Sequence, residues 1–93
     1  MFNVNEYFEG KVKSISFENA NGEATIGVMA KGEYEFGTST KEIMEVISGE
    51  MKVKLPNSDE WLTITPGEVF EVDKDQKFLV DVVEDTAYMC LYK

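Results

Sequence analysis

Histidine and arginine are absent from the 93 residues, and cysteine occurs once, at Cys90. The absence of histidine excludes a Ser-His-Asp triad and a metal site ligated by imidazole, and the absence of arginine excludes a guanidinium clamp on phosphate. The single cysteine excludes an internal disulfide. Any catalysis must therefore come from carboxylates, hydroxyls, lysines and backbone amides.

Long apolar runs and a basic leader are also lacking. No stretch approaches the roughly 18 apolar residues that a membrane span needs. Residues 1–6 lack the basic region and apolar core of a signal peptide. We therefore expect no membrane partner and a cytoplasmic location.

Positive charge is scarce, because nine lysines stand against eighteen carboxylates and the net charge is −9. This field opposes association with the phosphates of nucleic acids or with anionic lipids, so we expect no nucleic acid partner. A small anion is not excluded, because a few backbone N–H groups and one lysine can bind phosphate locally.

The chain has enough apolar residues for one core. It is 43% hydrophobic and 29% charged, which is typical of a folded protein. A chain of this length buries only about 60 to 65 per cent of its unfolded surface, so a second core is not expected. We predict a single domain over residues 1–93.

Apolar residues recur at every second position, and turn residues interrupt them about every ten positions, as in all-β sandwiches and barrels. The runs Lys11–Phe17 and Ala24–Ala30 flank Asn21-Gly22, a signal for a hairpin with a type I′ turn. We expect about eight or nine short strands and almost no helix.

Residues 39–46 allow a second interpretation. Ser39-Thr40-Lys41-Glu42 fits a capping box, from which a helix could run to Val46. The run reaches Gly49 before two turns are complete, so a strand is favoured. Residues 78–83 and 87–92 are apolar on both faces, as expected where one face meets a second sheet or subunit. We therefore expect a homodimer.

Two short motifs suggest a fold family. Glu42 and Gly49 stand in the spacing E-x6-G, and Gly67 opens a second stretch that reaches Phe78. They resemble the motifs of the cupins, which are double-stranded β-helix (jelly-roll) barrels that carry three histidines and a glutamate there. Of that set only Glu42 is present, and Phe78 stands where the last histidine would. One carboxylate cannot hold a metal with useful specificity, so we expect no metal and no other cofactor.

A second resemblance covers the full chain. It rests on ordered fragments, among them Asn5-Glu6-Tyr7-Phe8, Gly27-Val28-Met29, Gly32-Glu33-Tyr34, Val46-Ile47-Ser48-Gly49, Gly67-x-Val69-Phe70 and Tyr88-x-Cys90-x-Tyr92. Together they resemble the small cupin-type pyrimidine/purine nucleoside phosphorylases. The resemblance implies a metal-independent pentosyltransferase, that is, a glycosyltransferase. With phosphate as co-substrate it would convert purine and pyrimidine nucleosides to free base and ribose 1-phosphate.

Such a reaction needs a group beside the ribose, an anion site and a surface for the base. Glu42 is the catalytic candidate, because an inward carboxylate can accept hydrogen bonds from ribose hydroxyls and favour positive charge on the ring. A surface glutamate is the alternative. Thr38 and Ser48 are candidate hydroxyl donors to substrate, and Thr38 is preferred to Ser39 by its parity with Phe36. Ser48 could instead satisfy its own turn.

Tyr34, Phe78 and Tyr92 are the candidate aromatic contacts to the base. Phe78 is favoured by its place at a lost ligand position and Tyr92 by its phenol, although core packing is the alternative for each. Lys11 and Lys13 form a basic pair that could meet phosphate, or could simply be solvated lysines on a strand face.

Two other functions remain open. A cupin that has lost its metal could serve as a non-enzymatic ligand-binding or dimerisation module. A sugar epimerase of related shape generally depends on a histidine base, which this chain lacks. Cys90 has no histidine to activate it, so a small buried apolar role is expected for the thiol.

Overall fold

A computed structural model describes residues 1–93 and contains ten strands and no helix. The strands are β1 (Val4–Tyr7), β2 (Val12–Asn19), β3 (Gly22–Met29), β4 (Gly32–Gly37), β5 (Glu42–Ser48), β6 (Met51–Lys54), β7 (Leu62–Ile64), β8 (Val69–Val72), β9 (Lys77–Val82) and β10 (Thr86–Tyr92). The all-β prediction is confirmed. The strand interpretation of residues 42–48 is also confirmed, whereas β1 was not predicted. The chain has no helix that could span a bilayer.

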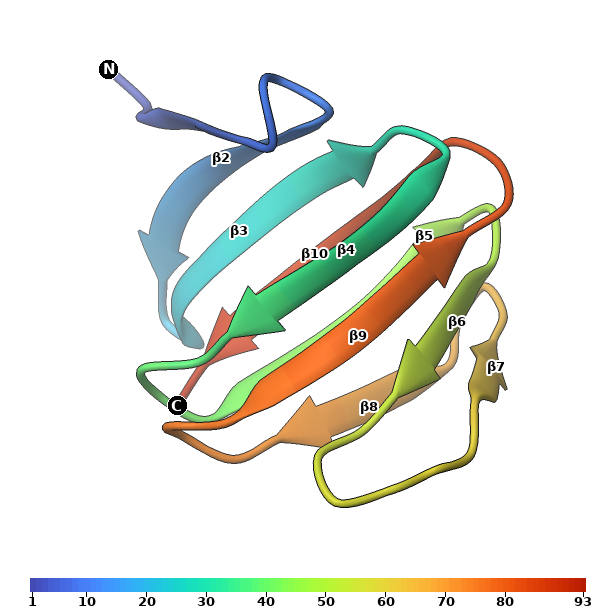
Figure 1. The fold of residues 1–93 in the computed structure, drawn as a ribbon. Helices are drawn as coiled ribbons and strands as arrows, with labels where there is room; N and C mark the ends of the chain where they lie inside the picture. The colour runs from blue at the N-terminus through green and yellow to red at the C-terminus, as the bar shows by residue number, and fades with distance from the viewer.

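The strands form two antiparallel sheets that face each other (Figure 1). One has six strands in the order β1-β2-β3-β10-β5-β8, and the other has four in the order β4-β9-β6-β7. From β3 onward the chain changes sheet at every connection except the one between β6 and β7. Strands that cross repeatedly between two sheets are typical of the jelly roll, so this architecture agrees with the predicted cupin-like barrel.

The core lies between the sheets and consists of 15 buried residues. An alternation of buried and exposed faces is clear in β6, where Met51 and Val53 are fully buried while Lys52 and Lys54 are partly exposed. Val46 on β5 and Val80 on β9 are also fully buried, so both sheets contribute to the same core. This packing fixes the two walls between which a ligand could lie.

The predicted hairpin joins β2 to β3, but its turn is not type I′. Asn19 pairs with Gly22, so Ala20 and Asn21 form the loop. A type I′ turn needs positive φ at both loop residues, and here only Gly22, after the loop, is positive, at 100°. The Asn19 Oδ1 atom accepts from the Asn21 N–H at 2.9 Å, and this side-chain contact closes the turn one residue earlier than predicted.

A register shift between β5 and β10 changes which side chains point inward near the end of β5. Tyr88 pairs with Val46 and Ala87 with Ser48, so Ile47 has no partner on β10. An extra residue of this kind interrupts the alternation of faces. Ser48, predicted as a hydroxyl donor to substrate, is exposed.

Candidate functional site

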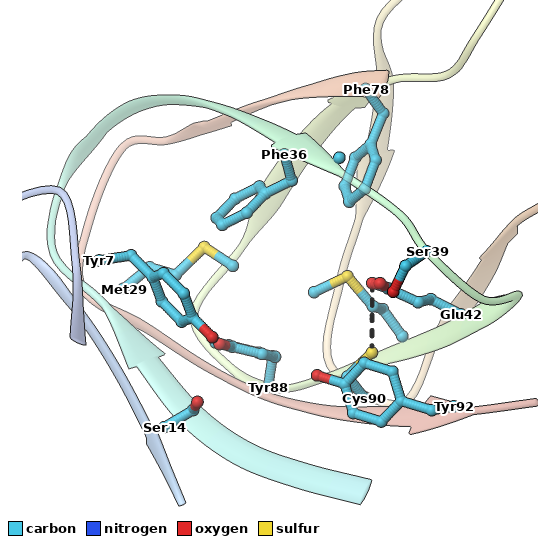
Figure 2. A pocket seen from close by; sticks show the side chains of 12 residues that line it. Tyr7, Ser14, Met29, Phe36, Ser39, Glu42, Phe78, Tyr88, Cys90 and Tyr92 are labelled. Atoms are coloured by element: carbon cyan, nitrogen blue, oxygen red, sulfur yellow. Dashed lines mark hydrogen bonds between the residues drawn. The ribbon is translucent and has the colours of Figure 1, made fainter. Parts of the chain in front are cut away.

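A cavity of about 270 Å³ lies between the two sheets. Its lining comes from β1, β2, β3, β5 and β10 of the larger sheet, from β4 and β9 of the smaller sheet, and from Ser39 in a loop. The lining residues are Tyr7, Ser14, Met29, Phe36, Gly37, Ser39, Glu42, Met44, Phe78, Tyr88, Cys90 and Tyr92. Figure 2 shows these side chains converging on a common space. Pockets for small molecules typically measure about 300–1,000 Å³, so this one suits a single compact ligand.

The smaller sheet supplies an aromatic wall. Phe36 on β4 pairs with Phe78 on β9, and their rings stack with centroids 5.7 Å apart and an interplanar angle of 30°. Phe70 also contacts Phe78, in an edge-on arrangement with ring centroids 6.0 Å apart. These ring contacts fix an aromatic wall in which Phe36 is partly buried and Phe78 is 2% exposed, and a planar group could pack against it.

The larger sheet supplies a wall of tyrosines. Tyr88 on β10 lies beside Gly27 on β3, where a Cβ atom would come within 2.7 Å of the phenol. The missing side chain at Gly27 thus leaves room for the ring. Burial raises the pKa of Tyr88 to about 12, and it also raises the pKa of Tyr92, whose oxygen lies 3.1 Å from Thr25 Oγ1. Both phenols are neutral hydrogen-bond donors at physiological pH.

Glu42 is the only carboxylate that lines the cavity. Its side chain is half-buried, and the Cys90 thiol donates to its Oε1 atom at 3.5 Å (Figure 2). Burial raises the pKa of Glu42, while the bond from Cys90 lowers it. No lysine lines the cavity, so an ionised Glu42 gives it a single negative charge.

Cys90 is a buried neutral thiol. Burial, with a smaller contribution from the charge of Glu42, raises its pKa to about 12. The thiolate is the reactive form, so at neutral pH Cys90 acts as a weak hydrogen-bond donor to Glu42 and not as a nucleophile. This placement agrees with the buried role expected from the sequence.

Three of the six predicted site residues meet in this cavity. Glu42 comes from the start of β5, Tyr92 pairs with it from the end of β10, and Phe78 faces both from β9. Figure 2 shows the three side chains pointing into the same space.

The other three predicted residues do not line the cavity. Tyr34 is buried in the core, where its hydroxyl donates to the Ala30 carbonyl at 2.5 Å. Thr38 is also buried and donates to the Asp73 carbonyl at 2.6 Å. Ser48 is exposed beyond the register shift in β5.

The lysine pair predicted as an anion site is also elsewhere. Lys13 forms an ion pair with Glu6 at 3.5 Å, and both side chains are more than half exposed. Lys11 is exposed, and neither lysine lines the cavity.

Tyr7, Ser14 and Ser39 line the cavity but were not predicted as site residues. Ser14 could have been found, because it alternates with Val12, which is fully buried. Thr38 was preferred to Ser39 as the hydroxyl donor because the alternation of inward and outward side chains was assumed to continue past Gly37. The strand β4 ends at Gly37, so the alternation does not reach the next two residues. Tyr7 gave no signal, because β1 has no clear alternation.

The fold and the cavity define the class: a cupin-type barrel with its pocket between the sheets. A cupin superfamily protein from Desulfitobacterium hafniense has a crystal structure that matches with a TM-score of 0.73 at 14% identity, over 95% of this chain and 82% of that one. At this identity the match shows the fold alone.

The family follows from the sequence comparisons. The family model described as pyrimidine/purine nucleoside phosphorylase matches residues 2–92, and the chain belongs to that family. A protein of that name from Pseudomonas syringae pv. syringae is 61% identical over 93 residues, covering 100% of each chain. A crystal structure of a protein of unknown function from Vibrio parahaemolyticus matches with a TM-score of 0.93 at 39% identity, over 97% of this chain and 96% of that one. Both resemblances seen in the sequence are confirmed.

The metal site that many cupins carry does not fit these residues. No group of three or more Asp, Glu or Cys side chains lies close enough to share an ion. In the cavity the possible ligands are Glu42 and Cys90, and the raised pKa of Cys90 opposes the thiolate form that binds metal. The polar groups that this cavity offers to a ligand are its carboxylate, its thiol and its hydroxyls.

Proposed function

We propose that the cavity catalyses the phosphorolysis of purine and pyrimidine nucleosides to free base and ribose 1-phosphate. The family and the relative from P. syringae carry the name of this activity. Within the chain, the supporting observation is one half-buried carboxylate, Glu42, in a cavity with a stacked aromatic wall.

In this reaction an oxygen of phosphate forms a bond to C1′ of the ribose. The bond from C1′ to the base nitrogen breaks, and its electron pair leaves with the base. The ribose gains oxocarbenium character in the transition state, as in glycoside hydrolysis. An ionised Glu42 would accept hydrogen bonds from the ribose hydroxyls and stabilise that positive charge. Its effect is larger in the transition state than in the neutral nucleoside, which is the condition for catalysis.

The aromatic walls suit the base. Stacking of a base on an aromatic side chain contributes about 1–3 kcal/mol and tolerates different bases, because every base has a π-face. Phe78 and Phe36 offer such a face, and the neutral phenols of Tyr88 and Tyr92 can donate to a carbonyl oxygen or a ring nitrogen. Recognition by stacking with few fixed edge contacts is consistent with a site that accepts both purines and pyrimidines.

The proposed reaction needs no metal and no organic cofactor, because phosphate supplies the nucleophile and the ligand set does not suit a metal ion. Treatment with a chelator should therefore leave the rate unchanged.

We also propose that a second copy of this chain covers the outer face of the six-stranded sheet. Ile15, Ile26 and Val28 are each about half exposed there, although they are large and apolar. Two-fold dimers are the commonest assemblies and pair one surface with itself. Light scattering should give twice the chain mass, and Ile26→Asp should give the chain mass. A wild-type monomer would contradict the proposal.

The activity is tested with chelator-treated protein, uridine or adenosine, and the release of free base measured by chromatography. Phosphate-dependent release from both nucleosides is expected. Absence of release in every condition would contradict the proposal and leave a cupin that binds a ligand without turning it over.

A further inference from the structure

Phosphate poses an electrostatic problem for this cavity, and the inference that follows rests on the proposed phosphorolysis. Sites for phosphate use lysine, arginine or free backbone N–H groups. The chain has no arginine, and no lysine lines the cavity. The single charge in the cavity is the carboxylate of Glu42, which repels a dianion. Any positively charged side chain that binds phosphate would therefore lie outside this lining.

A second depression adjoins the cavity at Ser39, which lines both. Its lining consists of Ser39, Thr40, Lys41, Asp73, Lys74 and Lys93. No apolar residue is among them, and three of the nine lysines of the chain are. In a chain with a net charge of −9, this is a local gathering of positive charge at one end of the barrel. A phosphate here could direct one oxygen past Ser39 towards the ribose.

The two loops that form the depression are fixed to each other by Thr38. Its hydroxyl donates to the Asp73 carbonyl at 2.6 Å and accepts from the Gln76 N–H at 3.0 Å. Its own N–H donates to Gln76 O at 2.9 Å, and its carbonyl accepts from the Asp75 N–H at 3.0 Å. Thr38, which was predicted to touch substrate, is therefore a residue that positions the 38–41 loop against the 73–76 turn.

The 38–41 loop has donors to spare. The N–H groups of Ser39 and Thr40 donate to no backbone carbonyl. Both residues also carry hydroxyls, and that of Thr40 makes only a long contact, at 3.4 Å, with the Lys41 carbonyl. The N–H groups of successive residues in an irregular loop can form a concave site for an anion. Lys41 and Lys74 would add charge to these dipoles.

The present partners of the lysines are weak enough to be displaced. Lys41 Nζ lies 3.5 Å from Glu71 Oε2, and both side chains are about half exposed, at 46% and 57%. Exposed ion pairs of this kind contribute only about 0–1 kcal/mol. Lys93 Nζ donates to the Asn21 carbonyl at 2.7 Å. Asp73 is the one acidic residue in the lining, so the three lysines leave an excess of positive charge there.

We propose that the depression between residues 38–41, residues 73–76 and Lys93 binds the phosphate group, as the co-substrate on entry and as the phosphoryl group of ribose 1-phosphate before release. Lys41 and Lys74 provide the charge, the Ser39 and Thr40 N–H groups and hydroxyls provide directed donors, and Thr38 holds the loops in place. Glu42 then acts on the ribose alone and is separated from the phosphate by Ser39.

The kinetic test compares a Lys41→Gln/Lys74→Gln variant with a Lys52→Gln/Lys54→Gln control on β6, which removes the same charge away from both depressions. The KM for phosphate should rise at least about tenfold in the first variant and stay near wild type in the control; tenfold corresponds to about 1.4 kcal/mol. The KM for uridine should change little in both. Lys41→Arg/Lys74→Arg, which keeps the charge, should restore most of the affinity for phosphate.

The binding test titrates wild-type protein with inorganic phosphate, and separately with ribose 1-phosphate, and follows backbone amides by NMR. Phosphate should shift the amides of Ser39 and Thr40, and ribose 1-phosphate should also shift those around Glu42 and Tyr92. Loss of the phosphate shifts in the double Gln variant, with a wild-type spectrum elsewhere, separates binding from misfolding.

The two proposals fail separately. Suppose that nucleosides are not cleaved, while phosphate still shifts the amide signals of Ser39 and Thr40 in wild type but not in the double Gln variant. In that case the anion site stands and the enzymatic proposal falls. If cleavage depends on phosphate but its KM is the same in the double Gln variant and the control, the anion site is wrong and the enzymatic proposal stands.

Discussion

The replacement of Glu42 by glutamine removes the one negative charge of the cavity and preserves the shape of the side chain. The oxygen that accepts from Cys90 is kept, so the local hydrogen bond at 3.5 Å can remain. Two unit charges about 4 Å apart interact by about 1 kcal/mol in water and about 4 kcal/mol at an effective dielectric constant of 20. Glu42 is half-buried, which favours the upper part of this range.

We therefore expect Glu42→Gln to lose about 2–4 kcal/mol of transition-state stabilisation, which lowers kcat/KM about 30- to 1,000-fold. The matched control is Glu45→Gln. Glu45 lies on the same strand, pairs with Met89 and does not line the cavity. The assay is phosphate-dependent release of uracil from uridine at pH 7.5. A Glu42→Gln enzyme no slower than the Glu45→Gln control would refute the role of Glu42.

The same variant tests the environment of Glu42 through stability. Burial raises the pKa of this carboxyl in the folded state, so the folded protein binds the proton more tightly than the unfolded chain. The contribution of Glu42 to the free energy of unfolding is fully present below the ordinary glutamate pKa and is lost as pH rises through the raised one. The free energy of unfolding of Glu42→Gln minus that of wild type should therefore be more positive at pH 8 than at pH 5. Urea unfolding at the two pH values measures this difference, and a difference of opposite sign contradicts the burial argument.

Three further substitutions test the walls of the cavity. Gly27→Ala places a Cβ atom 2.7 Å from the Tyr88 phenol, so it should lower the free energy of unfolding by about 1–3 kcal/mol in a denaturant titration and raise the KM for nucleosides. Wild-type values of both quantities would contradict this packing. Phe78→Leu removes the ring that stacks on Phe36, so the KM values of uridine and adenosine should rise together, by about 5- to 150-fold for a stacking loss of about 1–3 kcal/mol. An effect on the KM of one nucleoside alone would argue against stacking. Cys90→Ala should keep kcat within about threefold of wild type, and iodoacetamide should not inactivate the enzyme at pH 7, because the pKa of the thiol is about 12; a large loss would indicate a thiolate mechanism.

The period-two pattern predicted the fold because burial in a two-sheet barrel acts on single strands. Met51 and Val53 alternate with Lys52 and Lys54, and this signal needs no knowledge of the partner strands. The N-terminal strand β1 lacked the signal because it lies at the edge of the larger sheet, and three of its four residues are exposed. Edge strands are specified by their pairing, which the sequence does not display.

The site was predicted in part, and the errors have local causes. Glu42 and Phe78 were selected because they stand at positions of the two cupin-like motifs, and Tyr92 was selected for its phenol; all three line the cavity. Ser48 was misplaced by a register shift that only the pairing of β5 with β10 reveals. Thr38 was predicted to touch substrate, but its hydroxyl is used between two loops that lie far apart in the sequence.

We propose that a cavity with no fitting metal site, and with Glu42 as its single charge, transfers ribose from a base to phosphate. Phosphorus-31 NMR of chelator-treated protein with uridine and phosphate tests it most directly. The ribose 1-phosphate signal should grow in step with the free uracil, and Glu42→Gln should slow both equally. Uracil released without ribose 1-phosphate, or product formed only after a metal ion is added back, would contradict it.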